Sequence, residues 1–199
     1  DNAFSGCTGL TGMTIQGGVT MVGRLTTIGT GAFQGCSALA SMEVPLGVTS
    51  IGGGAFFGCS ALQGVTIPSS VTSVGAGAFV KCASLTSISV SAANTVYASI
   101  DGVLFNKAIT TLIQYPGGKA GAYAVPVGVT VDSNASGRCA GLPVASIPAS
   151  VSVIGSMAFY PCSGLGALTV DPANPAFASV NGVLYDKSLT TLIQYPGGQ

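Results

Sequence analysis

The 199-residue sequence contains no histidine and very few charged side chains. Six basic and six acidic residues make up 6% of the chain and give a formal net charge of zero. Histidine is the commonest general acid and base, and the carboxylates are scattered without a repeated pairing, so the sequence predicts no enzymatic activity. A chain without a basic patch also lacks the means to hold a nucleic-acid backbone, so no nucleic-acid partner is expected.

Long apolar runs are absent as well. Glycine, serine, threonine or proline interrupts every hydrophobic stretch within a few residues, whereas a membrane-spanning helix needs about 20 consecutive apolar residues. The sequence therefore predicts no membrane insertion. Hydrophobic residues nevertheless make up 48% of the chain, and the mean hydropathy is +0.64. This composition is sufficient for a substantial core and argues against intrinsic disorder.

What the chain does contain is an internal repeat. The phrase Ala-Phe-x-x-Cys-x-x-Leu occurs five times, and a degenerate copy carries Ser136 at the phenylalanine position. The repeated phenylalanines, expected to form a structural ladder, are Phe4, Phe33, Phe56, Phe79 and Phe159. Neighbouring copies are mostly 23 residues apart. A period of this length indicates a solenoid of stacked units.

Each repeat leucine is followed by apolar residues three and five positions later, and often by proline, as at Leu62, Val65, Ile67 and Pro68. Side chains alternate in direction along a strand, and proline ends the hydrogen-bonded ladder, so this pattern predicts a short strand. Parallel strands are expected to stack about 4.8 Å apart. Their seven expected centres are Ile15, Val44, Ile67, Val90, Val125, Ile147 and Val170. A Val-Thr-x-Ile/Val-Gly segment then predicts a turn into a short helical or irregular return.

Two longer units interrupt the repeat, at residues 91–119 and 171–199. They share one pattern at an offset of 80 residues, including an Asn/Asp-Lys pair at Asn106 and Asp186. Apolar, β-branched runs flank this pair in both units. Such runs on either side of a turn predict a β-hairpin inserted into the solenoid.

These motifs together resemble the BspA-like subclass of leucine-rich repeats, and the resemblance covers nearly all 199 residues. It implies an α/β repeat solenoid that is mostly β: a right-handed stack of short parallel strands with helical or irregular returns. It also implies a cell-surface or secreted protein used for adhesion and protein binding, and it transfers no catalytic residues. Two departures from the pattern are an insertion near residues 21–26 and the replacement at Ser136.

Six cysteines occupy one position of the repeat, namely Cys7, Cys36, Cys59, Cys82, Cys139 and Cys162. An even number in a secreted chain is compatible with disulfides. Stacked side chains run parallel, however, and their Cβ atoms do not converge as a disulfide requires. The pattern favours a ladder of buried thiols that act as small hydrophobic side chains. Zinc sites need clustered ligands, and the chain has no histidine, so no metal or cofactor is predicted.

A row of residues lies between the two apolar positions of the strands and is expected to point away from the core. This row contains Thr14, Glu43, Thr66, Ser89, Ser146 and Thr169. Solenoids present extended sheets as recognition surfaces, so the row predicts a binding face for a protein or a cell-surface glycan. A solvated sheet without a partner and a match to an ice lattice stay open as alternatives.

The chain is expected to form a single solenoid over residues 1–199, as a segment of a longer extracellular or cell-surface protein. Asn134-Ala135-Ser136 is an acceptor pattern for N-glycosylation in a secreted eukaryotic protein. Two function classes remain open. One is a non-catalytic binding or adhesion module. The other is a building block of an extracellular filament or layer, which associates with itself through uncapped solenoid ends.

Overall fold

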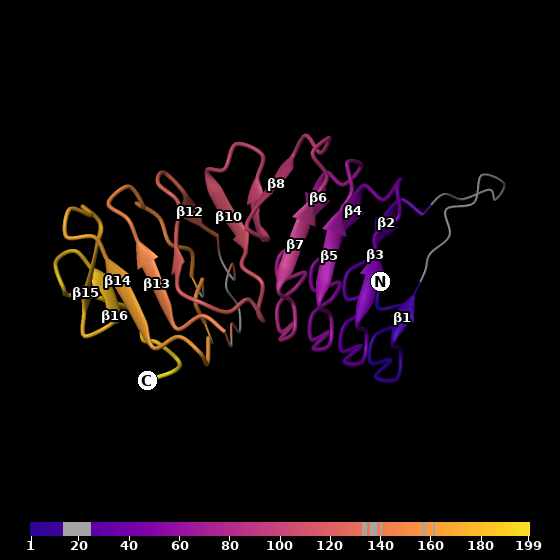
Figure 1. Cartoon of the computed structure of the whole chain (residues 1–199), viewed down its shortest axis with the longest axis horizontal. Coiled ribbons are helices and arrows are strands. Elements are labelled where there is room, and N and C mark those ends of the chain that lie inside the picture. Colours follow the sequence, from indigo (N-terminus) through magenta and orange to yellow (C-terminus); the bar gives the residue numbers. More distant parts are fainter. Residues whose placement is uncertain (14–24, 133–134, 136–138, 140, 157, 161) are drawn as a thin grey trace.

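The computed structural model of the chain describes residues 1–13, 25–132, 135, 139, 141–156, 158–160 and 162–199. Across these residues every regular element is a β-strand and no helix occurs. The strands lie side by side along an elongated, arched molecule (Figure 1). The fold is therefore a mostly β repeat solenoid.

The first parallel sheet follows the alternating apolar residues of the repeat. It contains, in this order, β1 (Gly12–Met13), β3 (Ser41–Glu43), β5 (Gly64–Ile67) and β7 (Ser87–Val90). In β5, Val65 and Ile67 are buried while Thr66 is exposed. This alternation places one face of the sheet on the core and leaves the other open. The strand expected near Ile15 falls outside the described residues, apart from β1.

A second parallel sheet uses the Val-Thr-x-Ile/Val-Gly segments, from which only a turn is predicted. It contains β2 (Thr27–Ile28), β4 (Ser50–Ile51) and β6 (Ser73–Val74). Ile28 and Ile51 are buried and pair in register with each other. Strands of two residues are too short to show an alternating pattern, so sequence periodicity does not reveal them.

The chain returns from the second sheet to the first through successive turns, and not through a helix, in the described residues. These turns stack from one repeat to the next: the Phe33 N–H donates to the carbonyl of Ala55 (2.7 Å). The rings stack as well. Centroid separations along Phe4, Phe33, Phe56 and Phe79 are 5.3, 5.2 and 5.4 Å, with interplanar angles of 8° or less. Regular turns that repeat every rung therefore replace the helical return that was one of the two alternatives.

None of the six cysteines, all of which lie among the described residues, forms a disulfide. Five are buried, and Cys7 is exposed. The Cys59 thiol donates to the carbonyl of Phe33 (3.1 Å), and the Cys82 thiol does the same to Phe56 (3.1 Å). The thiols thus fill the core and also satisfy a backbone carbonyl of the preceding rung.

Each longer unit is a three-stranded antiparallel meander. The first contains β8 (Tyr97–Ile100), β9 (Val103–Asn106) and β10 (Thr111–Gln114), and the second contains β15 (Phe177–Val180), β16 (Val183–Asp186) and β17 (Leu192–Gln194). The turn at Asp101 and Gly102 has φ values of 50° and 77°. Two positive φ values match the type I′ turn that favours Asp-Gly and Asn-Gly. This turn precedes the predicted one after Asn106, which joins β9 to β10.

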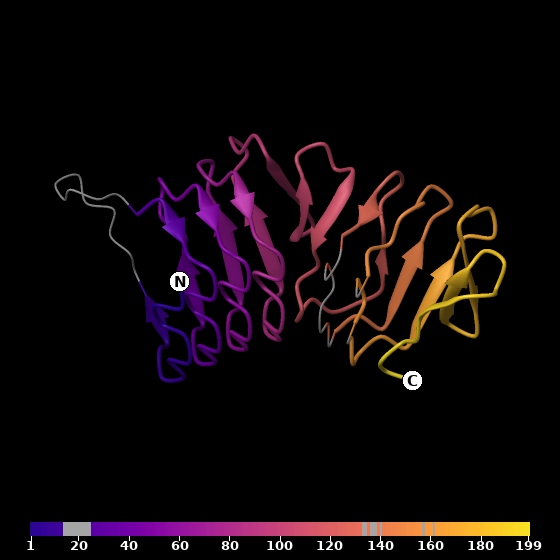
Figure 2. The same ribbon diagram turned by 180° about the vertical axis from the view of Figure 1, so that it is seen from behind.

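The third parallel sheet contains β11 (Tyr123–Ala124), β13 (Val144–Ile147) and β14 (Ala167–Val170), while β12 (Thr130–Val131) pairs with β10. The parallel strands expected from the repeat therefore form two separate sheets, because the first meander separates β7 from β11. Its tip occupies the place of the next rung: the Ile88 N–H donates to the carbonyl of Gly102 (2.8 Å). Both views show the meander between the two groups of parallel strands (Figures 1 and 2).

The hydrophobic core divides at the same place. One buried cluster runs from Ile28 to Leu104, and the other runs from Val103 to Leu184. Phe159 and the cysteines at 139 and 162 belong to the second cluster. The two clusters meet at the consecutive residues Val103 and Leu104 of β9, so this strand joins the two halves of the solenoid.

Candidate binding face

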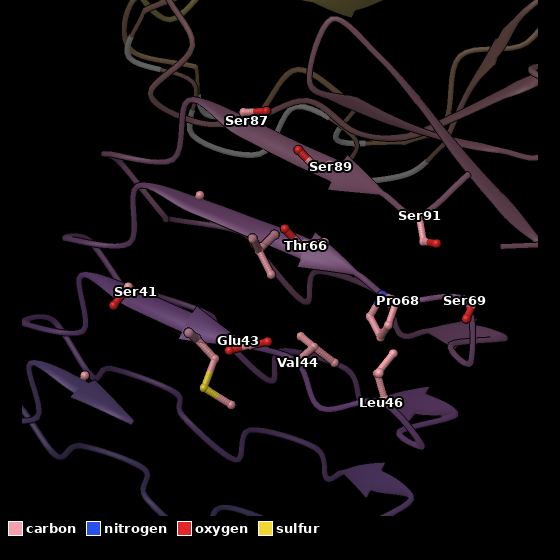
Figure 3. Close-up of a pocket in the computed structure, with 14 residues that line it drawn as sticks. Ser41, Glu43, Val44, Leu46, Thr66, Pro68, Ser69, Ser87, Ser89 and Ser91 are labelled. Atoms are coloured by element: carbon pink, nitrogen blue, oxygen red, sulfur yellow. The ribbon is translucent and has the colours of Figure 1, made fainter. Parts of the chain in front are cut away.

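The open face of the first sheet carries a hollow of about 850 Å³. Side chains of β3, β5 and β7 form its floor, and the segments that follow these strands form one side (Figure 3). Glu43, Thr66 and Ser89, three residues of the predicted row, are exposed and lie in it. They are direct neighbours in the parallel register, Glu43 beside Thr66 and Thr66 beside Ser89. The structure therefore brings this part of the row together.

Small residues form a second row beside the first. Gly12 pairs with Ser41, and Gly64 pairs with Ser87. These serines were not among the predicted site residues, although they stand two positions before the predicted row in each strand. A Cβ atom at Gly64 would come no closer than 3.8 Å to any neighbouring atom. The hollow is open here because the side chains are short, and not because the backbone is held apart.

A smaller hollow of about 300 Å³ lies on the third sheet. Ser146 and Thr169 from the predicted row line it and are register partners, and the Thr169 hydroxyl donates to Ser146 Oγ (3.0 Å). Ala124 occupies the position next to Ser146 in the register. The predicted row is thus split in two by the meander. Thr14 and the glycosylation candidate Asn134 lie outside the described residues.

The larger hollow holds one charged side chain among the described residues that line it, Glu43. Its carboxylate makes no hydrogen bond or ion pair with any described residue. Among the described residues that line the smaller hollow, Asp171 is the charged one, and its carboxylate accepts a hydrogen bond from the Ala173 N–H (2.8 Å). At the edge of the larger hollow, Leu46 is 82% exposed. The larger hollow therefore combines hydroxyls, one unpaired carboxylate and an apolar edge.

Two buried asparagines, Asn94 and Asn174, were not predicted from the sequence. Asn94 donates through Nδ2 to the carbonyls of Pro68 (2.8 Å) and Val71 (2.9 Å), and its Oδ1 accepts from the N–H groups of Val96 (2.8 Å) and Tyr97 (2.7 Å). Asn174 makes the same four kinds of contact in the second unit. Their signal in the sequence is an asparagine kept at the 80-residue offset. Their role is structural, because they tie each meander to the preceding rung.

Burial raises the pKa of Cys59 to about 12, which leaves little nucleophilic thiolate near neutral pH. In the described part of the chain, no three His, Cys, Asp or Glu side chains are grouped so that they could hold a metal ion. The same part contains no helix long and apolar enough to cross a membrane.

Several known proteins are similar to this chain. A family model for the BspA type leucine-rich repeat region matches residues 1–116 and 129–183 in six copies. A leucine-rich cell surface protein of Faecalibacterium prausnitzii A2-165 is 34% identical, with a TM-score of 0.65, over 72% of this chain and 38% of that protein. The pneumococcal vaccine antigen PcpA is 26% identical, with a TM-score of 0.65, over 74% of this chain and 37% of the antigen. This chain therefore spans less than two fifths of either structure. A search of curated proteins finds no match.

Proposed function

Because the chain belongs to the BspA-type leucine-rich repeat family, we propose that it is a non-catalytic protein-binding module of a cell-surface or secreted adhesion protein. The observation that carries the proposal is the hollow over β3, β5 and β7, where Glu43, Thr66 and Ser89 lie side by side on one open face. The similar Faecalibacterium protein is a cell surface protein, which supports the proposed location.

The physical properties of this face suit recognition of a protein. Short strands that bury Met42, Val65 and Ile88 hold the exposed residues in fixed positions, so little conformational entropy is lost when a partner binds. Serine and threonine hydroxyls can donate and accept hydrogen bonds. A nearly uncharged surface also loses little charge solvation on contact.

Binding to cells tests the proposal, with the larger hollow blocked in one variant. Thr66→Tyr fills the centre of the hollow, whereas Ser73→Tyr places the same ring on exposed β6 of the second sheet. Flow cytometry with the labelled chain is expected to show binding that falls about tenfold in Thr66→Tyr and persists in Ser73→Tyr. Equal binding by the two variants, or no binding by the parent chain to bacterial or host cells, contradicts the proposal.

A further inference from the structure

We infer that the larger hollow selects a protein segment that presents a lysine or arginine side chain, and that Glu43 provides this selectivity. The inference rests on the proposed protein-binding function and names the chemistry of the partner. Glu43 is an exposed carboxylate without an intramolecular partner in the described residues, and none of the described residues that line the hollow is a cation. A cationic group placed there gains a charge-assisted hydrogen bond that the chain itself does not provide.

The surroundings of Glu43 suit a long side chain with a charge at its end. The adjacent row of Gly12, Ser41, Gly64 and Ser87 has no side chain longer than a hydroxymethyl group. An extended methylene stem can lie along such a floor while its charged end reaches the carboxylate. The hydroxyl of Thr66, next to Glu43 in the register, can accept a further N–H bond. Lysine and arginine are the protein side chains with this combination of stem and charge.

Cations of a second copy are poorly suited to this role. Lys81 lies 4.3 Å from the centre of the Phe57 ring, and Lys187 donates to the carbonyl of Pro172 (2.9 Å). Lys107 donates to the carbonyl of Ala92 (3.4 Å). Three of the four lysines are thus already engaged within the chain, which leaves Lys119, while Arg24 and Arg138 lie outside the described residues. We therefore commit to a different protein as the source of the cation, and a second copy is an outcome that the test distinguishes.

The smaller hollow provides a control within the same molecule. It repeats the open parallel sheet and the hydroxyl row, but Ala124 stands at the register position of Glu43. The carboxylate of Asp171 nearby is occupied by the Ala173 N–H. The two hollows therefore differ in volume and in the availability of a carboxylate at one matched position.

The test uses end-capped peptides of twelve residues, built from glycine, serine, alanine and valine, with one central lysine, arginine, glutamine or glutamate. Binding is followed through the backbone amide signals of β3, β5 and β7 in NMR titrations. The lysine and arginine peptides are expected to bind about fivefold more tightly than the glutamine peptide, which is the upper range for one exposed ion pair. Raising the salt concentration to about 0.5 M should remove most of this preference.

Two substitutions assign the preference to one carboxylate. Glu43→Gln keeps the shape of the side chain and should make the lysine and glutamine peptides bind equally. Ala124→Glu should create a second site, reported by amide shifts in β13 with the lysine peptide alone. Equal binding of all peptides to the parent chain, or an unchanged preference in Glu43→Gln, overturns the inference while leaving protein binding by the hollow intact.

Further outcomes distinguish the other occupants. If no peptide shifts the amide signals of β3, β5 and β7 at millimolar concentration, the inference fails. Whether the hollow binds a protein at all is tested separately, by the binding of the Thr66→Tyr variant to cells. Amide shifts that grow with chain concentration without peptide, and vanish in Glu43→Gln, identify a second copy as the partner and overturn the inference. Amide shifts that are caused by neutral oligosaccharides and not by the lysine peptide identify a glycan as the partner. They also overturn the inference.

Discussion

At the position before each of the first four repeat cysteines, the backbone adopts a left-handed conformation. Three of these positions hold Gly6, Gly35 and Gly58, with φ values of 75°, 74° and 77°. The fourth holds Lys81 at a φ of 64°, a conformation that strains a residue with a Cβ atom by about 1 kcal/mol. Its ammonium group lies 4.3 Å from the centre of the Phe57 ring, a cation–π contact that offsets part of this strain.

Two substitutions at this lysine separate the strain from the cation–π contact. Lys81→Ala removes the contact and keeps the strain, whereas Lys81→Gly removes both. We expect the glycine variant to be more stable than the alanine variant by about 1 kcal/mol in urea denaturation. Equal stability of the two variants would show that the rung relaxes around Lys81 and that no strain is present.

Two tyrosine hydroxyls give opposite predictions for the same chemical change. The Tyr97 hydroxyl accepts a hydrogen bond from the Val74 N–H (2.8 Å), whereas the Tyr123 hydroxyl is buried without a partner in the described residues. Tyr97→Phe should lower the free energy of unfolding by about 1 to 2 kcal/mol, because it leaves a donor unsatisfied. Tyr123→Phe should be neutral or raise it by about 1 kcal/mol. Thermal denaturation of the two variants measures this difference. A loss of stability in both variants contradicts the claim that the Tyr123 hydroxyl is buried without a hydrogen-bond partner.

On the scale of elements, each meander depends on one buried asparagine. Asn94→Ala removes four hydrogen bonds and leaves the Val71 carbonyl without this donor, while the Pro68 carbonyl keeps the Val71 N–H (3.3 Å). We expect a loss of about 3 kcal/mol in urea denaturation, with hydrogen exchange that quickens first in β8. The half-buried Asn106, which accepts N–H bonds in the turn after β9, offers the comparison. Asn106→Ala should lower stability by about 1 kcal/mol, and a similar loss in both variants contradicts the special role of Asn94.

Strand β13 is expected to open more readily than β5. Ala145 is the small residue at a core position where Val65, Ile88 and Leu168 stand in other strands, and its neighbour β11 has only two residues. A less filled core gives a rung that unfolds locally before the rest of the solenoid. Hydrogen exchange should therefore be faster at residues 144–147 than at residues 64–67. Equal protection would mean that Tyr123, the register partner of Ala145, compensates for the missing volume.

The sequence predicts the first and third parallel sheets well, because Val65 and Ile67 and their equivalents repeat with a strand period. It fails for β2, β4 and β6, which are too short to alternate. It also places a single hairpin turn after Asn106 and overlooks the turn at Asp101, so a meander is read as one hairpin. In the candidate site, the alternation of side chains along the strands is enough to predict that Glu43, Thr66 and Ser89 point away from the core. The separation of these residues from Ser146 cannot be predicted in this way, because it depends on how the meander tip pairs with β7.

For the whole molecule, burial of weakly acidic groups predicts a loss of stability in alkali. Burial raises the pKa of Tyr115 to about 12 from an ordinary value of 10.0, and that of Cys59 to about 12 from 9.0. Burial also raises the pKa of Cys82 and Tyr123. The folded state holds these protons more tightly, so its advantage is complete below pH 9 and declines as pH rises from about 9 to 12.

Urea denaturation at pH 7, 9 and 11 measures this decline. The midpoint should change little between pH 7 and 9 and fall between pH 9 and 11. Cys59→Ala, although less stable at pH 7, should lose less stability over the second interval because one titrating group is gone. A midpoint that is constant up to pH 11, or an equal decline in the variant, contradicts this account.

The division of the core at β9 has a mechanical consequence for a surface protein of the proposed kind. Tension along the arch passes from the cluster that ends at Leu104 to the cluster that begins at Val103. Each cluster has its own buried contacts, so one half can yield under load while the other half stays folded. Pulling then lengthens the molecule in two separate events. Unfolding of the first half lengthens the chain and so lowers the force on the half that is still folded. A partner bound to that folded half can then stay attached under a sudden shear force.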